Sequence, residues 1–177
     1  RADQLRGNQD YTVIMLSDLE APRIEQIVKS FGVSYDFDAV AVCAQDHGVP
    51  PPGMSHLDFR HNMFKARLAE KPYPHTLLYK SDRVPASMNR LKSIAKSAEQ
   101  LPAAEIYVMD SGMAAILGAS LDSLCRRKER FLVLDIATSH TVGAAIGGEE
   151  LAGFFEYHTQ DIALEKLEDL IRDLADG

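Results

Sequence analysis

The sequence contains no tryptophan and only two cysteines among its 177 residues. Cys43 and Cys125 both lie within apolar runs, which is typical of small buried side chains in a reducing compartment. Two distant cysteines supply neither a disulfide framework nor the closely spaced thiolates that hold an iron–sulfur cluster. We therefore expect no iron–sulfur cofactor.

Long hydrophobic runs and an excess of positive charge are also missing. No apolar stretch approaches the roughly 20 residues required to span a bilayer, and the first residues lack the apolar core of a signal peptide. The formal net charge is -7 at pH 7. This argues against nucleic acid or anionic lipid as a partner, because both are bound by clustered positive charge. The composition predicts a soluble, cytoplasmic protein with no membrane partner.

Strand-like and helix-like apolar spacing alternates through the first two thirds of the chain. Strands are expected at 11–16, 39–44, 77–79 and 106–109, and helices at 22–31, 57–70, 85–101 and 113–124. The run at 39–44 is continuous, which favours a buried strand. Glycine and proline exclude regular structure from 45–55.

The last third of the chain changes pattern. Three strand-like runs, at 131–136, 141–146 and 151–157, are joined by segments short enough for hairpins, so antiparallel pairing is expected. An amphipathic helix follows with Asp161 as its expected N-cap. We therefore expect an α/β fold whose first part is residues 1–125 and whose second, β-β-β-α part is residues 126–177. Because position 1 is Arg and strand-like residues begin at Tyr11, we expect a piece of a longer chain.

The sharpest chemical pattern surrounds Asp135, near the end of an expected strand. Small and hydroxylated residues follow it at a tight turn, where N–H groups and hydroxyls donate to phosphate oxygens while a carboxylate holds a hydrated metal. Asp135 is the expected carboxylate, with magnesium bound through water. The expected phosphate-binding residues are Asp135, Ala137, Thr138, Ser139, His140 and Thr141. The alternative interpretation is a polar hairpin that binds nothing.

The segment upstream of this turn, Met109-Asp-Ser-Gly-Met-Ala-Ala-Ile-Leu-Gly-Ala-Ser-Leu-Asp122, resembles the connecting helix of the actin, heat-shock chaperone and sugar-kinase superfamily. In that superfamily the helix crosses between two ribonuclease-H-like domains, and a strand then reaches a phosphate motif of pattern Asp-x-Gly-x-x-Thr. The same order of elements runs over 105–176 here. The resemblance implies a partial ribonuclease-H-like, actin-like ATPase architecture, with ATP and magnesium as ligands of the full-length protein. It also implies that the first phosphate loop precedes residue 1 and that the adenosine-binding segment follows residue 177.

Two positions depart from the superfamily pattern. Ala137 stands where glycine is usual, which places a Cβ where backbone and phosphate approach closely and disfavours positive φ. His140 is also unusual at its position. Two interpretations follow: an ATPase or kinase-like module that handles a nucleotide or another small phosphate-bearing ligand, and a binding or regulatory module of the same fold without turnover.

The chain contains four further short patterns: Ala-Gln-Asp-His-Gly48, Asp58-Phe-Arg60, Ser-Asp-Arg83 and Ala-Thr-Ser-His-Thr141. Together they resemble one family within this superfamily, labelled pyruvate formate-lyase activating enzyme-like. A true activating enzyme of that kind is a radical enzyme that needs three closely spaced cysteines for an iron–sulfur cluster. The sequence therefore does not predict the chemistry that the label names.

A second polar cluster surrounds the proline-rich loop. Asp46, His47 and Gly48 end an expected strand, and ligands gather at strand carboxyl ends in open α/β sheets. The substrate-facing candidates are Asp46, His47, Gly48, Asp82 and Arg83. A third interpretation is a metal-dependent enzyme that uses Asp46 and His47, because imidazole and carboxylate suit zinc, iron or manganese. The nearby His56, Asp58 and His61 are further candidate ligands, and a rigid surface loop is the competing interpretation.

Overall fold

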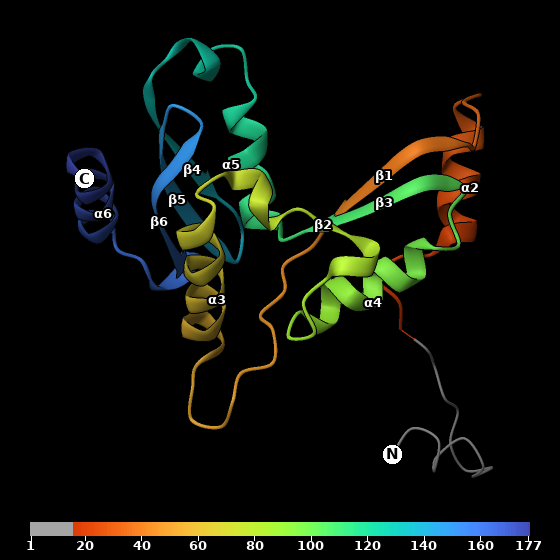
Figure 1. Ribbon diagram of the computed structural model, residues 1–177, viewed down its shortest axis with the longest axis horizontal. Coiled ribbons are helices and arrows are strands. Elements are labelled where there is room, and N and C mark those ends of the chain that lie inside the picture. The colour runs from red at the N-terminus through yellow and green to blue at the C-terminus, as the bar shows by residue number, and fades with distance from the viewer. Residues whose placement is uncertain (1–15) are drawn as a thin grey trace.

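The computed structural model describes residues 16–177 of the chain (Figure 1). The strand expected at 11–16 lies outside these residues except for its last position. The described part is a mixed α/β fold with five helices, one mixed three-stranded sheet and one antiparallel three-stranded sheet. Within residues 16–177, every helix is too short or too polar to cross a membrane.

The first sheet has the strand order β1-β3-β2. β1 (Phe37–Cys43) pairs parallel with β3 (Ala103–Met109), whereas the short β2 (Tyr79–Lys80) pairs antiparallel with β3. Parallel neighbours require a long crossover, and here the crossover contains α3, β2 and α4. Helices α2 (Ala21–Ser30) and α4 (Asn89–Ala98) pack with this sheet. α4 begins later than expected because Pro85 forms a turn instead, in which the N–H of Met88 donates to its carbonyl at 3.0 Å.

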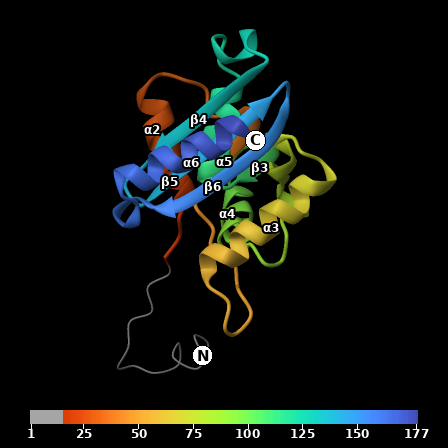
Figure 2. The same ribbon diagram turned by 90° about the vertical axis from the view of Figure 1, so that its left-hand side faces the viewer.

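The second sheet is the meander that the short joints predict. β4 (Arg130–Ile136), β5 (His140–Gly147) and β6 (Glu150–His158) pair antiparallel in that order. α6 (Leu164–Asp176) lies on one face of this sheet and α5 (Ser111–Ser120) on the other (Figure 2). The expected cap at Asp161 is wrong: Asp161 ends a short 3-10 turn, η4 (Thr159–Asp161), and Ala163 precedes α6 without a side-chain hydrogen bond.

Figure 1 shows two lobes. The first lobe comprises the first sheet with α2 and α4. The second lobe comprises the second sheet with α5, α6, α3 (His56–Glu70) and the short η1 (Pro74–Leu77). The chain passes between the lobes along 44–55, at Leu78 and at Asp110. The expected domain boundary near residue 125 stays a prediction. Both α3 and α5 precede that residue and pack with the second sheet.

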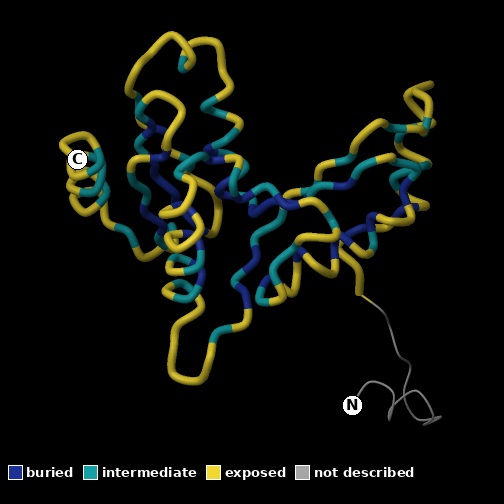
Figure 3. Tube along the Cα trace, in the orientation of Figure 1, coloured by how far each residue is buried: buried dark blue, intermediate teal, exposed yellow. Residues whose placement is uncertain are grey.

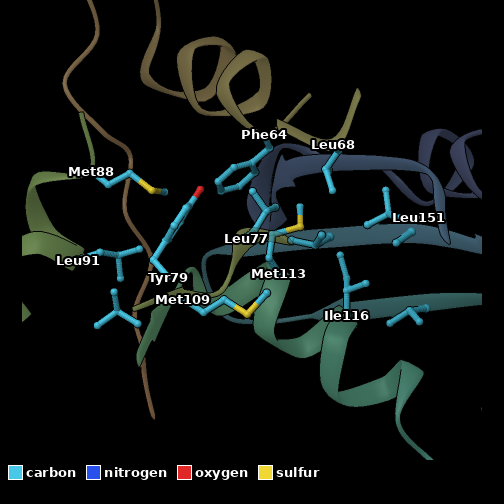
Figure 4. Packing of buried hydrophobic residues seen from close by; sticks show 14 of the residues in the cluster. Phe64, Leu68, Leu77, Tyr79, Met88, Leu91, Met109, Met113, Ile116 and Leu151 are labelled. Atoms are coloured by element: carbon cyan, nitrogen blue, oxygen red, sulfur yellow. The ribbon is translucent and has the colours of Figure 1, made fainter. Parts of the chain in front are cut away.

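One hydrophobic core runs through the junction between the lobes (Figure 4). Leu91 and Met88, from the first lobe, and Phe64, Met113 and Ile116, from the second, belong to the same buried cluster. A smaller cluster beneath α2 contains Leu19, Ala98 and Leu101. Burial of apolar surface across the junction therefore holds the two lobes in contact and fixes the loops that pass between them.

β1 is more exposed than its continuous apolar run predicts. Ala39, Ala41 and Cys43 are exposed, while Val40 and Val42 are half-buried and pack toward the core (Figure 3). The expectation of a buried strand is therefore wrong, because the described residues cover only one face of β1. The expectation of buried cysteines is wrong for the same strand, and Cys125 is half-buried.

Candidate functional site

The candidate site lies at the junction of the lobes, where the β4–β5 hairpin faces the segment after β1 and the first turn of α5. A cavity of about 50 Å³ is lined there by residues of all three segments. These include Gln45, Ser111, Gly112, Asp135 and His140. A larger open hollow of about 730 Å³ lies between β4 and α6, but the buried charged residues converge at the junction. The smaller cavity has room for a few water molecules or one small polar group, not for a whole nucleotide.

The hairpin bend is closed by its own backbone. The N–H of Ala137 donates to the carbonyl of His140 at 3.1 Å, and the Thr159 hydroxyl donates to the carbonyl of Ala137 at 2.7 Å. Both main-chain polar groups of Ala137 are therefore engaged. Positive φ occurs only at glycines in residues 16–177, so the conflict expected between alanine and a left-handed backbone does not arise.

Four of the six predicted phosphate-binding residues line the cavity. They are Asp135, Ala137, Ser139 and His140. Asp135 pairs with Val142 across the hairpin, and both line the cavity, so they share the face of the sheet on which α5 lies. The sequence-predicted bend is thus brought to the junction.

The other two predicted residues lie elsewhere on the hairpin. Thr141 is the neighbour of His140 along β5, so its side chain points to the opposite face of the sheet. It is buried, with its hydroxyl 3.1 Å from the hydroxyl of Thr159. Thr138 is exposed at the turn and is not part of the cavity lining. Neither hydroxyl therefore faces the cavity.

His140 is held between the lobes. Its Nδ1 lies 2.6 Å from Nε2 of Gln45, which follows β1, and 3.1 Å from the Ser139 hydroxyl. Its ring lies 4.4 Å from that of His158 and 5.5 Å from that of His47, measured between centroids. Burial, followed by the neighbouring His158 and Arg60, lowers the pKa of His140 from 6.5 to about 4. The imidazole is therefore neutral at neutral pH.

His47 connects the two sequence-predicted clusters. It is half-buried, its ring lies between His140 and His56, and the centroid distance to His56 is 6.1 Å. Burial is the main cause that lowers the pKa of His47, and the Arg60 guanidinium acts in the same direction. His47 of the loop and His140 of the hairpin are 93 positions apart in the sequence (140 − 47 = 93). In the structure they thus form one site.

Asp46 has a structural role at this junction. Its Oδ1 accepts from the N–H of Gly48 and its Oδ2 from the N–H of Leu91, both at 2.8 Å. Leu91 is in the first turn of α4, so Asp46 caps that helix from outside its own sequence. Gly48 has φ +69°, and a Cβ there would lie 2.7 Å from the ring of Phe59. Two backbone donors to the carboxylate favour a cap over a metal ligand.

Sequence reasoning missed a buried ion network beside the cavity. Arg60 donates to Asp110, at the end of β3, and to Glu156, in β6. Arg60 and Asp110 are each 1% exposed, and Glu156 is 7% exposed. Burial raises the pKa of Glu156, while the Arg60 guanidinium opposes this shift. One signal was available: Arg60 precedes Phe64 and Leu68 at four-residue spacing, so it occupies the buried stripe of α3.

Asp110 connects this network to the first lobe. Its Oδ1 accepts from the N–H of Gly112 at 3.0 Å, which caps α5, and its Oδ2 accepts from the N–H of Asp46 at 3.1 Å. We call Asp46, Asp110, Arg60 and Glu156 the junction network. It runs without a gap from α4 in the first lobe to β6 in the second.

The remaining predicted residues lie outside the cavity. Asp82 and Arg83 are exposed in η2 (Ser81–Arg83). Asp58 accepts from the hydroxyl of Ser55 at 2.6 Å at the start of α3, and His61 packs on Phe154 at 4.6 Å between centroids. Within residues 16–177 no group of three His, Cys, Asp or Glu side chains is arranged to hold a metal ion. A magnesium ion here would thus take most of its ligands from water and from phosphate oxygens.

Comparisons with known proteins add one finding. A family model described as "Putative pyruvate format-lyase activating enzyme (DUF1786)" matches residues 4–177. No curated protein and no solved structure gives a significant match.

Proposed function

This chain belongs to the DUF1786 family, and from its junction site we propose that it is a phosphate-binding module of the actin-like ATPase type. One observation carries the proposal. The Asp135 bend and the first turn of α5 lie on the same cavity between two lobes. The Asp135 carboxylate and the hydroxyl-bearing Ser139 face one space beside the start of α5, where Asp110 already accepts from the N–H of Gly112. A carboxylate and a hydroxyl at one bend suit a phosphate with its metal ion.

The charges at the cavity favour a phosphate that carries a cation. Asp135, Glu156 and Arg60 line it, and Asp110 lies behind the lining, bonded to Arg60. Arg60 forms its ion pairs with Asp110 and Glu156. Asp135 is therefore the cavity carboxylate that is not paired with Arg60. The net negative charge of the cavity would repel a free phosphate, but it would attract the cation of a magnesium phosphate. Asp135 would hold the cation through water.

The cavity volume limits how the ligand enters. About 50 Å³ has room for a terminal phosphoryl group. The remainder of a nucleotide would lie outside the cavity. The proposed module therefore recognises the end of a phosphate chain rather than a base.

The residues present do not fit the chemistry in the family description. The two cysteines lie on different lobes, Cys43 in β1 and Cys125 in η3 (Cys125–Arg127) beside α5. An iron–sulfur cluster needs several thiolates within one coordination sphere. The proposed function therefore involves no such cluster.

The bend geometry favours binding without turnover as a second candidate function. Because the hairpin uses the N–H of Ala137, that group is not available to stabilise a phosphate in a transition state. This candidate predicts no hydrolysis of ATP above background by the full-length protein. A phosphate-release assay that finds turnover, abolished by Asp135→Asn, would contradict it.

The binding proposal is tested by isothermal titration of the full-length protein with Mg-ATP. We expect Asp135→Asn to weaken binding at least about tenfold, because a neutral amide attracts the hydrated cation less. Chelation of magnesium should have the same effect. Asp82→Asn, an exposed carboxylate outside the cavity, is the matched control. Unchanged affinity in Asp135→Asn would refute the proposal.

A further inference from the structure

We propose that His140 is a neutral hydrogen-bond donor that contacts an oxygen atom of the bound ligand, and that Gln45 positions it. This inference rests on the proposed function and adds a specificity-determining residue to the same site. The ligand atom is an acceptor, such as a terminal oxygen of a phosphoryl group.

The tautomer of His140 follows from its partners. The Gln45 amide nitrogen lies 2.6 Å from Nδ1 of His140, and an amide nitrogen donates but does not accept. Nδ1 is therefore the acceptor, and the ring proton lies on Nε2. The Ser139 hydroxyl, 3.1 Å from Nδ1, can donate to the same nitrogen and is compatible with this assignment.

The Nε2 donor lacks an acceptor. It is fully buried, and no hydrogen-bond partner is found for it in the described part of the chain. A buried donor without a partner destabilises a folded protein, so such groups are normally paired. His140 is one of the residues that line the cavity. Because Nε2 itself has no accessible surface, a small shift of the ring is needed to bring this donor to a water or a ligand oxygen there.

The surroundings of His140 keep this donor neutral. His158 and His47 pack against its ring, and Arg60 lies on the same cavity, so a further positive charge is disfavoured. The Asp110 carboxylate acts in the opposite direction but more weakly than these groups and burial. His140 therefore donates to the ligand from a neutral imidazole, and its own charge does not change between about pH 5 and pH 8.

Gln45 acts through His140 and connects the two lobes. It follows β1 of the first lobe, whereas His140 begins β5 of the second. The bond between them exists only while the lobes keep this arrangement. A ligand that needs the Nε2 donor therefore binds best to the arrangement in which Gln45 reaches Nδ1.

The test uses full-length protein labelled with ¹⁵N in its histidines and the probe Mg-AMPPNP. Long-range ¹H–¹⁵N spectra should show the free protein with its His140 proton on Nε2, and Mg-AMPPNP should shift that resonance. His140→Ala should weaken the Kd about tenfold, the loss expected for one hydrogen bond. His140→Gln, whose amide nitrogen lies near the Nε2 position, should recover most of the affinity. His75→Ala, an exposed histidine in η1, is the control.

The Gln45→Ala variant tests the positioning role. It should increase the fraction of the Nδ1–H tautomer and weaken the Kd less than His140→Ala does. A residue that only supports the fold would leave the tautomer ratio unchanged. An unchanged ratio would overturn the role of Gln45.

Two outcomes separate this inference from the proposed function. If Mg-AMPPNP binds and Asp135→Asn abolishes binding, but the His140 resonance and the His140→Ala affinity do not change, this inference is overturned and the proposed function stands. If the wild-type protein does not bind Mg-AMPPNP, both are overturned. Should His140→Ala fail to fold, the wild-type spectra decide, because a proton on Nδ1 or an unshifted Nε2 resonance refutes the contact.

Discussion

The backbone N–H of Asp46 donates to Oδ2 of Asp110 at 3.1 Å, although the two residues are 64 positions apart. Each residue also caps a helix: Asp46 caps α4 in the first lobe, and Asp110 caps α5 in the second. Two places where the chain passes between the lobes are thereby bonded to each other. The orientation of both helices at the cavity depends on this pair.

Replacing Asp46 should loosen the first lobe. Asp46→Ala removes both acceptors and leaves the N–H groups of Gly48 and Leu91 without partners. We expect a loss of about 2 kcal/mol in the free energy of unfolding, which urea denaturation would measure. Asp82→Ala, an exposed carboxylate, should change it by less than about 0.5 kcal/mol. Equal effects of the two variants would show that Asp46 is not a cap.

Removing the central cation of the junction network should be more costly. Arg60→Ala leaves Asp110 and Glu156 buried without their counter-charge. We expect a loss of about 3–5 kcal/mol in the free energy of unfolding. Lys65→Ala, an exposed cation on the same helix, should be nearly neutral. A loss of less than about 1 kcal/mol in Arg60→Ala would mean that water satisfies the carboxylates.

Two glycine substitutions should have opposite effects. A Cβ at Gly143 would lie 2.3 Å from the buried ring of Phe155, so Gly143→Ala should destabilise the second sheet by about 1–3 kcal/mol. Gly118 lies within α5, and a methyl group there would have no atom of residues 16–177 within 4 Å beyond its own helix backbone and chain neighbours. Gly118→Ala should therefore stabilise the protein by about 0.5–1 kcal/mol. Thermal unfolding of both variants checks the signs.

His140 should make stability depend on pH. The pKa of His140 falls from 6.5 to about 4 on folding. As the pH is lowered through this range, His140 is therefore protonated in the unfolded chain before it is protonated in the folded chain. The contribution of His140 to the free energy of unfolding is therefore complete above pH 6.5 and decreases as the pH falls toward 4. The decrease is at most about 1.4 kcal/mol per pH unit. Glu156, whose pKa is raised, has the opposite sign, so the comparison must be with a variant.

His140→Phe isolates this contribution. Denaturation of the wild type and of His140→Phe between about pH 4.5 and 7 should give a smaller loss of stability on acidification in the variant. Parallel curves for the two proteins would contradict the lowered pKa of His140.

Much of the fold was predictable because its elements are encoded locally. The short joints after β4 and β5 predict the antiparallel meander, and the helical spacing predicts α2 and α3 within a residue or two of their ends. The N-cap of α6 and the burial of β1 were predicted wrongly. Burial depends on what packs over a strand, and no local pattern reports that.

The site was predicted only in part. Asp135 and His140 belong to one short motif, so their pattern could be recognised. The partners of Arg60 are 50 and 96 positions away along the chain. A single sequence carries little information about such long-range pairs.

By itself the amino-acid sequence determined the α/β alternation, the closing β-β-β-α unit and the Asp135 bend, because hydrophobic period and turn chemistry act over a few residues. Only the tertiary structure decided that Gln45 and His47 meet His140, and that Asp46 caps a helix. Those outcomes follow from the apolar core shared by the two lobes. Formation of this core removes the polar groups beside it from water. Those groups must then form hydrogen bonds with each other, because a buried polar group without a partner is unfavourable.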